Sequence, residues 1–411
     1  MTFRLHGVDG GRVYATDGRR VLVESPEGSH RVDGSPIRFE RRGQLPRPGS
    51  ATDRDRPPVR RRVETTRPWR TLLSSVVGPF PVVNLWPLGP TDLVATVGDG
   101  LYSSHDGGRS WQCRRLLPPS SGPMGTLPTG LCWTGDAVLL GEYPLATDTT
   151  PRVLLSTDRG RSWTVEAELP WARHVHGVHY DPYAGQVWVT TGDADAACRV
   201  GLLRDGSVEP VGGGSQRWRA VDLVFTPDAV LWGVDCAYAD RNELLRLPRS
   251  ALDRRGLDPE PTTVHAVDGS VYYGAAGTVD GERWVAFATA AETGVDRTAP
   301  GSERRSQSGR SGRPTAELVV STSATGFERW ATLGRFRKQP QPADVVPRGR
   351  LPTASGYLFV AADPTRGLLV NPYNLVASDG QLFAVDDDRL CGDGAERGGA
   401  RAARPTRTGD D

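Results

Sequence analysis

Two copies of one short motif constrain the fold of this 411-residue chain more than any other feature of its sequence. Segments 103–111 (SSHDGGRSW) and 155–163 (LSTDRGRSW) share the pattern Ser-x-Asp-x-Gly-x-Ser-Trp. The Asp can cap the amides of its own turn, the Gly can take left-handed dihedrals, and the Trp can pack between neighbouring sheets. Segment 321–330 is a degraded third copy that lacks the Asp. Recurrence of such a unit indicates a repeat architecture.

The motif resembles the Asp-box of the sialidase-like β-propellers, also called the BNR repeat. The resemblance implies an all-β fold of radially arranged four-stranded blades. It also implies that the box lies on the face opposite the active site. We place the box at the turn between the third and fourth strands of a blade. The resemblance covers most of the chain as a fold and only the two boxes as a motif.

The rest of the sequence agrees with strands and turns. Short apolar runs bounded by Gly, Pro, Asp and Asn recur roughly every 8 to 12 residues, and helical periodicity is hard to find. Counted from the boxes, the runs between residues 82 and 390 make six blades. The N-terminal runs GRVYAT and RRVLVES would then be outer strands that close the ring. We therefore predict a six-bladed β-propeller, with seven blades as the alternative, in which residues 1–40 and a partner strand form the extra blade.

Composition predicts the limits of the domain. Residues 1–390 are expected to form a single propeller, interrupted at 41–70 and 289–316 by disordered segments or long loops. Both interruptions are polar and rich in Arg, Ser, Gly and Pro, so they can bury little apolar surface. The segment 391–411 has the same composition and is expected to be a disordered tail.

Charge and hydropathy narrow the expected partners. The formal net charge is +1, which gives no overall field to attract nucleic acid or an anionic membrane. No run approaches the roughly 18 apolar residues of a membrane span, and no signal peptide is seen, so we expect a cytoplasmic protein. Five cysteines without a CxxC pair argue against a disulfide framework or a thiolate zinc site. The oligomeric state stays open.

Four acids recur at one place in the predicted blades, directly after the second strand. They are Asp99, Glu142, Asp193 and Asp235. In a propeller these positions share one face, so the acids would form a partial ring around the axis. The alternative is that acids simply favour turns at strand ends.

The segment 173–185 (RHVHGVHYDPYAG) carries three of the seven histidines. Strand alternation puts His174 and His176 on one side of the strand, at the mouth of the central funnel. Such a pair can act as general base or bind a divalent metal, for which Asp193 is the candidate third ligand. No full ligand set is visible, so we predict no cofactor and keep a divalent metal at His174 and His176 as the alternative. A hydrogen-bonded structural pair would also explain the pattern.

Other side chains at the same predicted face could hold a sugar. Arginines suit two-point contact with a carboxylate or sulfate, and tyrosines with amide neighbours suit sugar rings. Tyr143 beside Glu142 is one such phenol. The predicted substrate-binding residues are Arg173, Gln216, Arg217, Arg219, Tyr238, Asn371 and Tyr373.

The resemblance also implies a catalytic apparatus: a tyrosine nucleophile assisted by a glutamate, an aspartate acid/base and three arginines. Glu142 and Tyr143 match the first pair in type, but adjacent strand residues point in opposite directions. The family's Arg-Ile-Pro motif is absent, and no arginine triad can be assigned.

We therefore predict a carbohydrate-directed propeller binding a glycan or small sugar. A glycoside hydrolase using carboxylates from Glu142, Asp193 and Asp235 is the leading enzyme class. A polysaccharide lyase using His174 or His176 with a tyrosine is the second. A noncatalytic glycan-binding or protein-interaction module is the other alternative. An enzyme requires the histidines and the acids to converge, whereas a platform would scatter them or occupy them in ion pairs.

Overall fold

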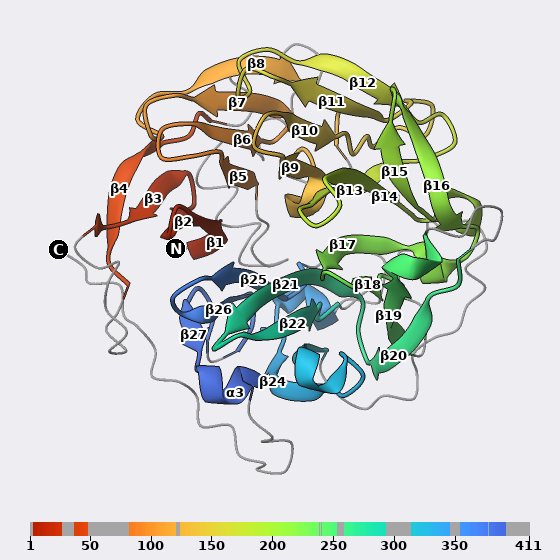
Figure 1. Cartoon of the computed structure of the whole chain (residues 1–411). Helices are drawn as coiled ribbons and strands as arrows, with labels where there is room; N and C mark the ends of the chain where they lie inside the picture. The colour runs from red at the N-terminus through yellow and green to blue at the C-terminus, as the bar shows by residue number, and fades with distance from the viewer. Residues whose placement is uncertain are drawn as a thin grey trace.

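The structure is a computed structural model that describes most of the chain. The described residues are 3–26, 37–47, 82–120, 124–237, 239, 241–252, 259–292, 314–345, 354–376 and 378–391. They form seven antiparallel sheets, arranged as blades around a common axis (Figure 1).

Each blade is a meander of strands that are consecutive in sequence. Blades one to three contain β1 (Phe3–Asp9), β2 (Arg12–Asp17), β3 (Arg20–Glu24) and β4 (Phe39–Gln44); β5 (Val83–Pro87), β6 (Leu93–Val97), β7 (Gly100–Ser104) and β8 (Gln112–Leu116); and β9 (Leu131–Trp133), β10 (Val138–Gly141), β11 (Arg152–Ser156) and β12 (Thr164–Glu168). Blades four and five contain β13 (Val175–Asp181), β14 (Gln186–Thr191), β15 (Arg199–Arg204) and β16 (Ser207–Gly213); and β17 (Ala220–Phe225), β18 (Ala229–Val234), β19 (Asn242–Pro248) and β20 (Thr262–Val267). Blades six and seven contain β21 (Val271–Val279), β22 (Glu282–Thr289), β23 (Thr315–Thr322) and β24 (Ala331–Arg337); and β25 (Tyr357–Asp363), β26 (Gly367–Tyr373) and β27 (Phe383–Val385), followed by α3 (Asp387–Cys391).

The structure corrects the count of six blades and agrees with the alternative of seven. The N-terminal runs do not serve as outer strands of another sheet, because β1 to β4 pair with one another as a complete four-stranded blade. Short turns join β1 to β2 and β2 to β3, and such turns favour pairing between neighbouring strands over pairing with distant ones.

Three predicted irregular segments contain regular structure at their edges. β4 extends to Gln44, inside the segment 41–70. β22 ends at Thr289 and β23 begins at Thr315, both inside 289–316. The short helix α3 reaches Cys391, the first residue of the predicted tail. The remaining parts of these segments lie largely outside the described residues.

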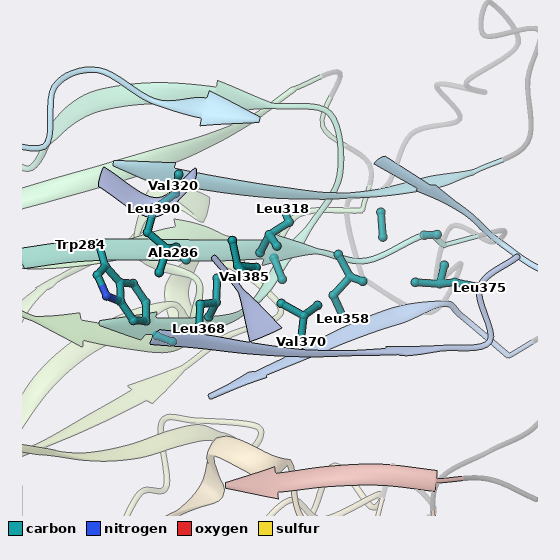
Figure 2. Close-up of a cluster of buried hydrophobic side chains, with 14 residues drawn as sticks. Trp284, Ala286, Leu318, Val320, Leu358, Leu368, Val370, Leu375, Val385 and Leu390 are labelled. Atoms are coloured by element: carbon teal, nitrogen blue, oxygen red, sulfur yellow. The ribbon is translucent and has the colours of Figure 1, made fainter. Parts of the chain in front are cut away.

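The core consists of seven apolar clusters, and each fills a gap between neighbouring blades. Figure 2 shows the cluster between blades six and seven, where Trp284 and Leu318 face Leu368 and Val370. A twisted sheet with two apolar faces can bury both only between other sheets, which is why the blades close into a ring.

The ring closes by packing and by polar contacts rather than by a shared sheet. β1 lies beside β25 (Figure 1), and the Leu5 amide donates to Asn371 Oδ1 at 2.9 Å. The Arg366 guanidinium donates to both oxygens of the buried Glu24 carboxylate, at 2.9 and 2.8 Å. The first and last blades are therefore joined by an ion pair between Glu24 and Arg366.

The two repeated motifs form the β7–β8 and β11–β12 turns, as predicted. In the first, Asp106 accepts hydrogen bonds from the amides of Arg109 and Ser110 and from the hydroxyls of Ser104 and Ser110. Trp111 donates from its indole nitrogen to the carbonyl of Gly108, at 3.1 Å. The second turn repeats this arrangement around Asp158, which accepts from the Ser162 amide and from the hydroxyls of Ser156 and Ser162. Trp163 likewise donates to the carbonyl of Gly160.

The degraded third copy forms the equivalent β23–β24 turn without its Asp. The Trp330 indole donates to the carbonyl of Phe327, at 3.0 Å. Phe327 has a φ of 62°, in the left-handed region that Gly108 occupies in the first turn with a φ of 91°. The turn geometry thus survives where blade packing retains the Trp.

Replacing Asp106 by alanine should destabilise the fold by about 1 to 2 kcal/mol, because two turn amides lose their acceptor. Burial acts in the opposite direction, but hydrogen bonds from Ser110 and Ser104 lower the pKa of Asp106 to about 2. The stabilisation is therefore present above about pH 4 and is lost as the pH falls toward 2. Urea unfolding at pH 7 and pH 2.5 measures this, with Thr325→Ala in the third copy as control. An equal loss at both pH values would contradict the assignment.

Candidate functional site

One face of the propeller collects the starts of the inner strands and the ends of the second strands. β13 and β17 begin there, and β14 and β18 end there, followed by Asp193 and Asp235. Third strands run away from this face, so the two repeated turns lie on the opposite face. This topology brings four of the predicted site residues to one face, namely His174, His176, Asp193 and Asp235.

Asp193 has an unusual backbone that aims its carboxylate. Its φ is 86°, a left-handed conformation that side chains other than Gly seldom adopt. The preceding Gly192 is required for space, since a Cβ there would lie 2.3 Å from Cε1 of His176. Gln216 steadies the loop by donating from Nε2 to the carbonyl of Asp193, at 3.0 Å.

The carboxylate of Asp193 contacts both predicted histidines. His174 Nε2 lies 2.6 Å from Oδ2, and His176 Nε2 lies 3.7 Å from Oδ1. Both rings are almost fully buried, and Asp193 is partly exposed. Burial alone would raise the pKa of Asp193, but the two histidines outweigh it and hold that pKa well below its usual range. Asp193 is therefore ionised across the physiological range.

Tyr143 covers the histidine pair from blade three. Its ring stacks on His174, with centroids 4.0 Å apart and an interplanar angle of 18°. Burial, then the charges of Asp193 and Asp235, raise the pKa of Tyr143. The phenol therefore stays protonated at neutral pH and can donate a hydrogen bond.

Two arginines border the carboxylates. Arg219 lies between Asp193 and Asp235. Its Nη2 is 3.4 Å from Asp193 Oδ1, and its Nε is 3.2 Å from Asp235 Oδ2. Arg173 Nε lies 3.5 Å from Asp193 Oδ2. Both guanidinium groups are partly exposed, so they can also reach a ligand.

A second carboxyl centre comes from blade six and was not predicted. Glu292 accepts hydrogen bonds from the Ser270 hydroxyl at 2.7 Å and the Tyr272 hydroxyl at 3.0 Å. Burial and the negative charge of Asp235 raise the pKa of Glu292 to about 7. Glu292 follows β22 much as Asp193 follows β14. The rule that selected four acids could have found it, but the sequence analysis assigned 289–316 to a disordered segment or long loop.

Bulges in two inner strands change the direction in which the side chains of His176 and Tyr272 point. The ladder between β13 and β14 skips His176, and the ladder between β21 and β22 skips Tyr272. A bulged residue leaves the pleat and can turn its side chain toward a site. Simple alternation along the strand could not foresee this.

Several predicted residues have other roles in the structure. Glu142 is fully buried and accepts two hydrogen bonds from Arg152, at 2.9 and 2.8 Å, so its carboxylate is occupied in a structural ion pair. Arg217 donates to the carbonyl of Pro261 at 2.8 Å, on the outer part of blade five. These contacts hold the two side chains to their own blades.

The C-terminal candidates belong to the ring closure. Asn371 bonds to the backbone of Leu5 and of Gln381. Tyr373 is buried in the apolar cluster between blades seven and one. Tyr238 lies outside the described residues. Asp99 accepts a hydrogen bond at 3.2 Å from the amide of Ser120, 21 residues later in the chain.

Two hollows open elsewhere. One of about 280 Å³ lies among the turns at the opposite ends of the inner strands and is lined by Tyr183, Phe225 and Arg283. One of about 130 Å³ lies in the central channel beside Arg4 and Asp222. Neither lining includes a predicted site residue, so we place the candidate site where the titratable groups converge.

The described residues contain one group of three possible metal ligands, His174, His176 and Asp193, whose ligating atoms lie within 4.8 Å of one another. In the same part of the chain, no helix has both the length and the apolar character that crossing a bilayer requires.

No protein-family profile and no curated protein sequence matches the chain. Among solved structures, an ancestral GH74 enzyme is similar at 11% identity and a TM-score of 0.47, covering 86% of this chain and 43% of that one. The GH74 xyloglucanase from Xanthomonas campestris is similar at 16% identity and a TM-score of 0.46, covering 76% and 46%. The N-terminal domain of Nup159 is similar at 11% identity and a TM-score of 0.45, covering 93% and 94%.

The chain thus spans less than half the length of the two GH74 structures. Similarity at this level concerns the course of the backbone and not the chemistry of a site. The ring of seven sheets establishes that the chain is a β-propeller.

Proposed function

We propose that this propeller is carbohydrate-directed and acts as a glycoside hydrolase at the face that carries Asp193, Asp235 and Glu292. The observation that carries the proposal is that two carboxyl groups meet at this face in different surroundings. Glu292 accepts hydrogen bonds from the Ser270 and Tyr272 hydroxyls. Asp235 instead lies 3.2 Å from Nε of Arg219. Burial and the charge of Asp235 raise the pKa of Glu292 to about 7, and a carboxyl group with a raised pKa is the usual general acid in glycoside hydrolysis.

Glu292 is the general acid of this proposal. Near neutral pH a large share of its carboxyl groups carry the proton that a leaving glycosidic oxygen must receive. Tyr272 and Ser270 orient the carboxyl through their hydrogen bonds. As the bond between the anomeric carbon and that oxygen breaks, the proton moves from Glu292 to the oxygen.

Asp235 is the partner carboxylate. It lies against Arg219 and its charge is one cause of the raised pKa of Glu292, so the two carboxyl groups share one site. A carboxylate at this place stabilises the positive charge that develops at the anomeric carbon. It also takes a proton from the water molecule whose oxygen forms the new bond to that carbon. Tyr143 and Tyr272 offer aromatic surface for a sugar ring, and Arg173 offers a partly exposed cation for an acidic substituent.

A panel of acidic and neutral polysaccharides, assayed for new reducing ends, tests the proposal. We expect wild-type turnover of at least one of them and a loss of about 100-fold or more in Asp235→Asn. The control is Glu243→Gln, a surface carboxyl paired with Arg217 on blade five. Binding without release of reducing ends would instead indicate a noncatalytic glycan-binding module. Products with the ultraviolet absorbance of an unsaturated uronate would indicate a lyase.

A further inference from the structure

We infer that His174, His176 and Asp193 form a binding site for one first-row divalent cation, of the zinc class. The inference goes beyond the proposed function, because cation binding can be measured without any glycan. Two imidazoles and one carboxylate are a ligand set that such ions favour over the all-oxygen sites of magnesium and calcium.

The spacing of the three groups fits a cation. Ligands of a tetrahedral zinc ion lie at about 2.1 Å from the metal and therefore about 3.4 Å from one another. The two distances between imidazole nitrogens and carboxylate oxygens, 2.6 and 3.7 Å, bracket that value. All three ligating atoms fall within 4.8 Å of one another. Modest side-chain rotations would thus bring them around one ion.

One buried ring nitrogen of the pair, Nδ1 of His176, makes no hydrogen bond within the described residues. Nε2 of each ring faces the Asp193 carboxylate. A buried polar atom without a partner is costly, and an ion that accepts its lone pair removes that cost. His176 is 1% exposed, so solvent does not satisfy it.

The surroundings hold the ligands in a fixed orientation. His174 Nδ1 lies 3.4 Å from the carbonyl of Pro144, the kind of contact that leaves Nε2 free to bind a metal. The stacked ring of Tyr143 fixes the plane of His174. The unusual backbone of Asp193 points the third ligand at the pair.

The nearby arginines leave the carboxylate available. Their nitrogens lie 3.4 and 3.5 Å from the Asp193 oxygens, longer than the 2.7 to 2.9 Å of a charge-assisted hydrogen bond. Formal charges of Arg173 and Arg219 balance those of Asp193 and Asp235. A bound dication therefore makes this group of residues net positive, which suits an anionic ligand at the remaining coordination position.

Calorimetric titration of the tag-free, chelator-treated full chain with Zn²⁺, Mn²⁺, Mg²⁺ and Ca²⁺ tests the inference. A Cys113→Ser background removes an exposed thiol that could bind zinc. We expect one zinc ion per chain, weaker manganese binding, and no competition from a tenfold excess of magnesium or calcium. Visible absorption of the cobalt form should show the intense bands of a tetrahedral site.

Variants locate the ion. His176→Ala and Asp193→Asn should each weaken zinc binding by at least about 100-fold, since even changes in outer-shell partners cost 10- to 100-fold. His265→Gln is the matched control. His265 lies on β20, the outer strand of blade five, and this variant should bind zinc as the wild type does. If a variant fails to fold, the visible spectrum of the wild-type cobalt form, which reports the nitrogen and oxygen ligands of the ion, replaces it. Absence of zinc binding, or equal affinity in all variants, would overturn the inference, whatever the glycan panel shows.

Discussion

Replacing Arg366 by methionine should lower the free energy of unfolding by about 3 to 5 kcal/mol. The change leaves the Glu24 and Asp363 carboxylates buried without the cation that contacts both. Breaking a buried ion pair from one side costs this much because the remaining charge stays desolvated. Urea unfolding monitored by tryptophan fluorescence measures the loss.

The control is Arg204→Met in blade four. Arg204 also contacts a carboxylate, Glu209, at 3.3 Å, but the two side chains are 47% and 57% exposed. An exposed pair contributes at most about 1 kcal/mol, so this variant should unfold nearly as wild type does. Hydrogen exchange should quicken first in β1 and β25 of the Arg366 variant, where the ring closes. Equal effects of the two substitutions would show that the ion pair joining the first and last blades contributes no more to the free energy of unfolding than an exposed pair does.

Replacing Glu292 by glutamine should reduce turnover of the glycan that the panel identifies by about 100- to 10,000-fold. Glutamine keeps the shape and can still accept one of the two hydrogen bonds from Ser270 and Tyr272, but it cannot transfer a proton. The Michaelis constant should change little, because binding contacts remain. Steady-state kinetics on the full chain separates the two effects.

The pH profile gives an independent check on Glu292. Its folded pKa of about 7 is raised by burial and by Asp235, so the protonated acid is abundant below pH 7 and disappears above it. Wild-type turnover should therefore fall as the pH rises through about 7. Residual turnover of Glu292→Gln should lack this limb. A variant that keeps the limb would assign the general acid to another group.

Local chemistry made much of the fold predictable. The strands of the last six blades follow the apolar runs of the sequence, because strand formation depends on short patterns and on turn residues close by. The two repeated turns are also local: Asp106 and Ser110 are four residues apart and bond to each other. The convergence of Asp193 and Asp235 followed from the rule that second strands end on one face. His174 and His176 lie at the same face because first strands begin there.

Other features depended on contacts between distant segments. The same rule selected Glu142, but its carboxylate pairs with Arg152 across a strand ladder, which no pattern at Glu142 indicates. Glu292 joins the site from a segment whose composition predicted disorder. Bulges at His176 and Tyr272 change the side that a residue faces, and a bulge is set by pairing with the neighbouring strand.

The sequence by itself determined the strands, the turns and the all-β propeller class, since these depend on neighbours a few residues apart. Only the tertiary structure decided the number of blades, because that number depends on how sheets pack around the axis and on the meeting of Glu24 with Arg366. It also decided which acids share a site. Carboxyl groups acquire shifted pKa values from charges and burial contributed by other blades, and chain order alone does not contain that information.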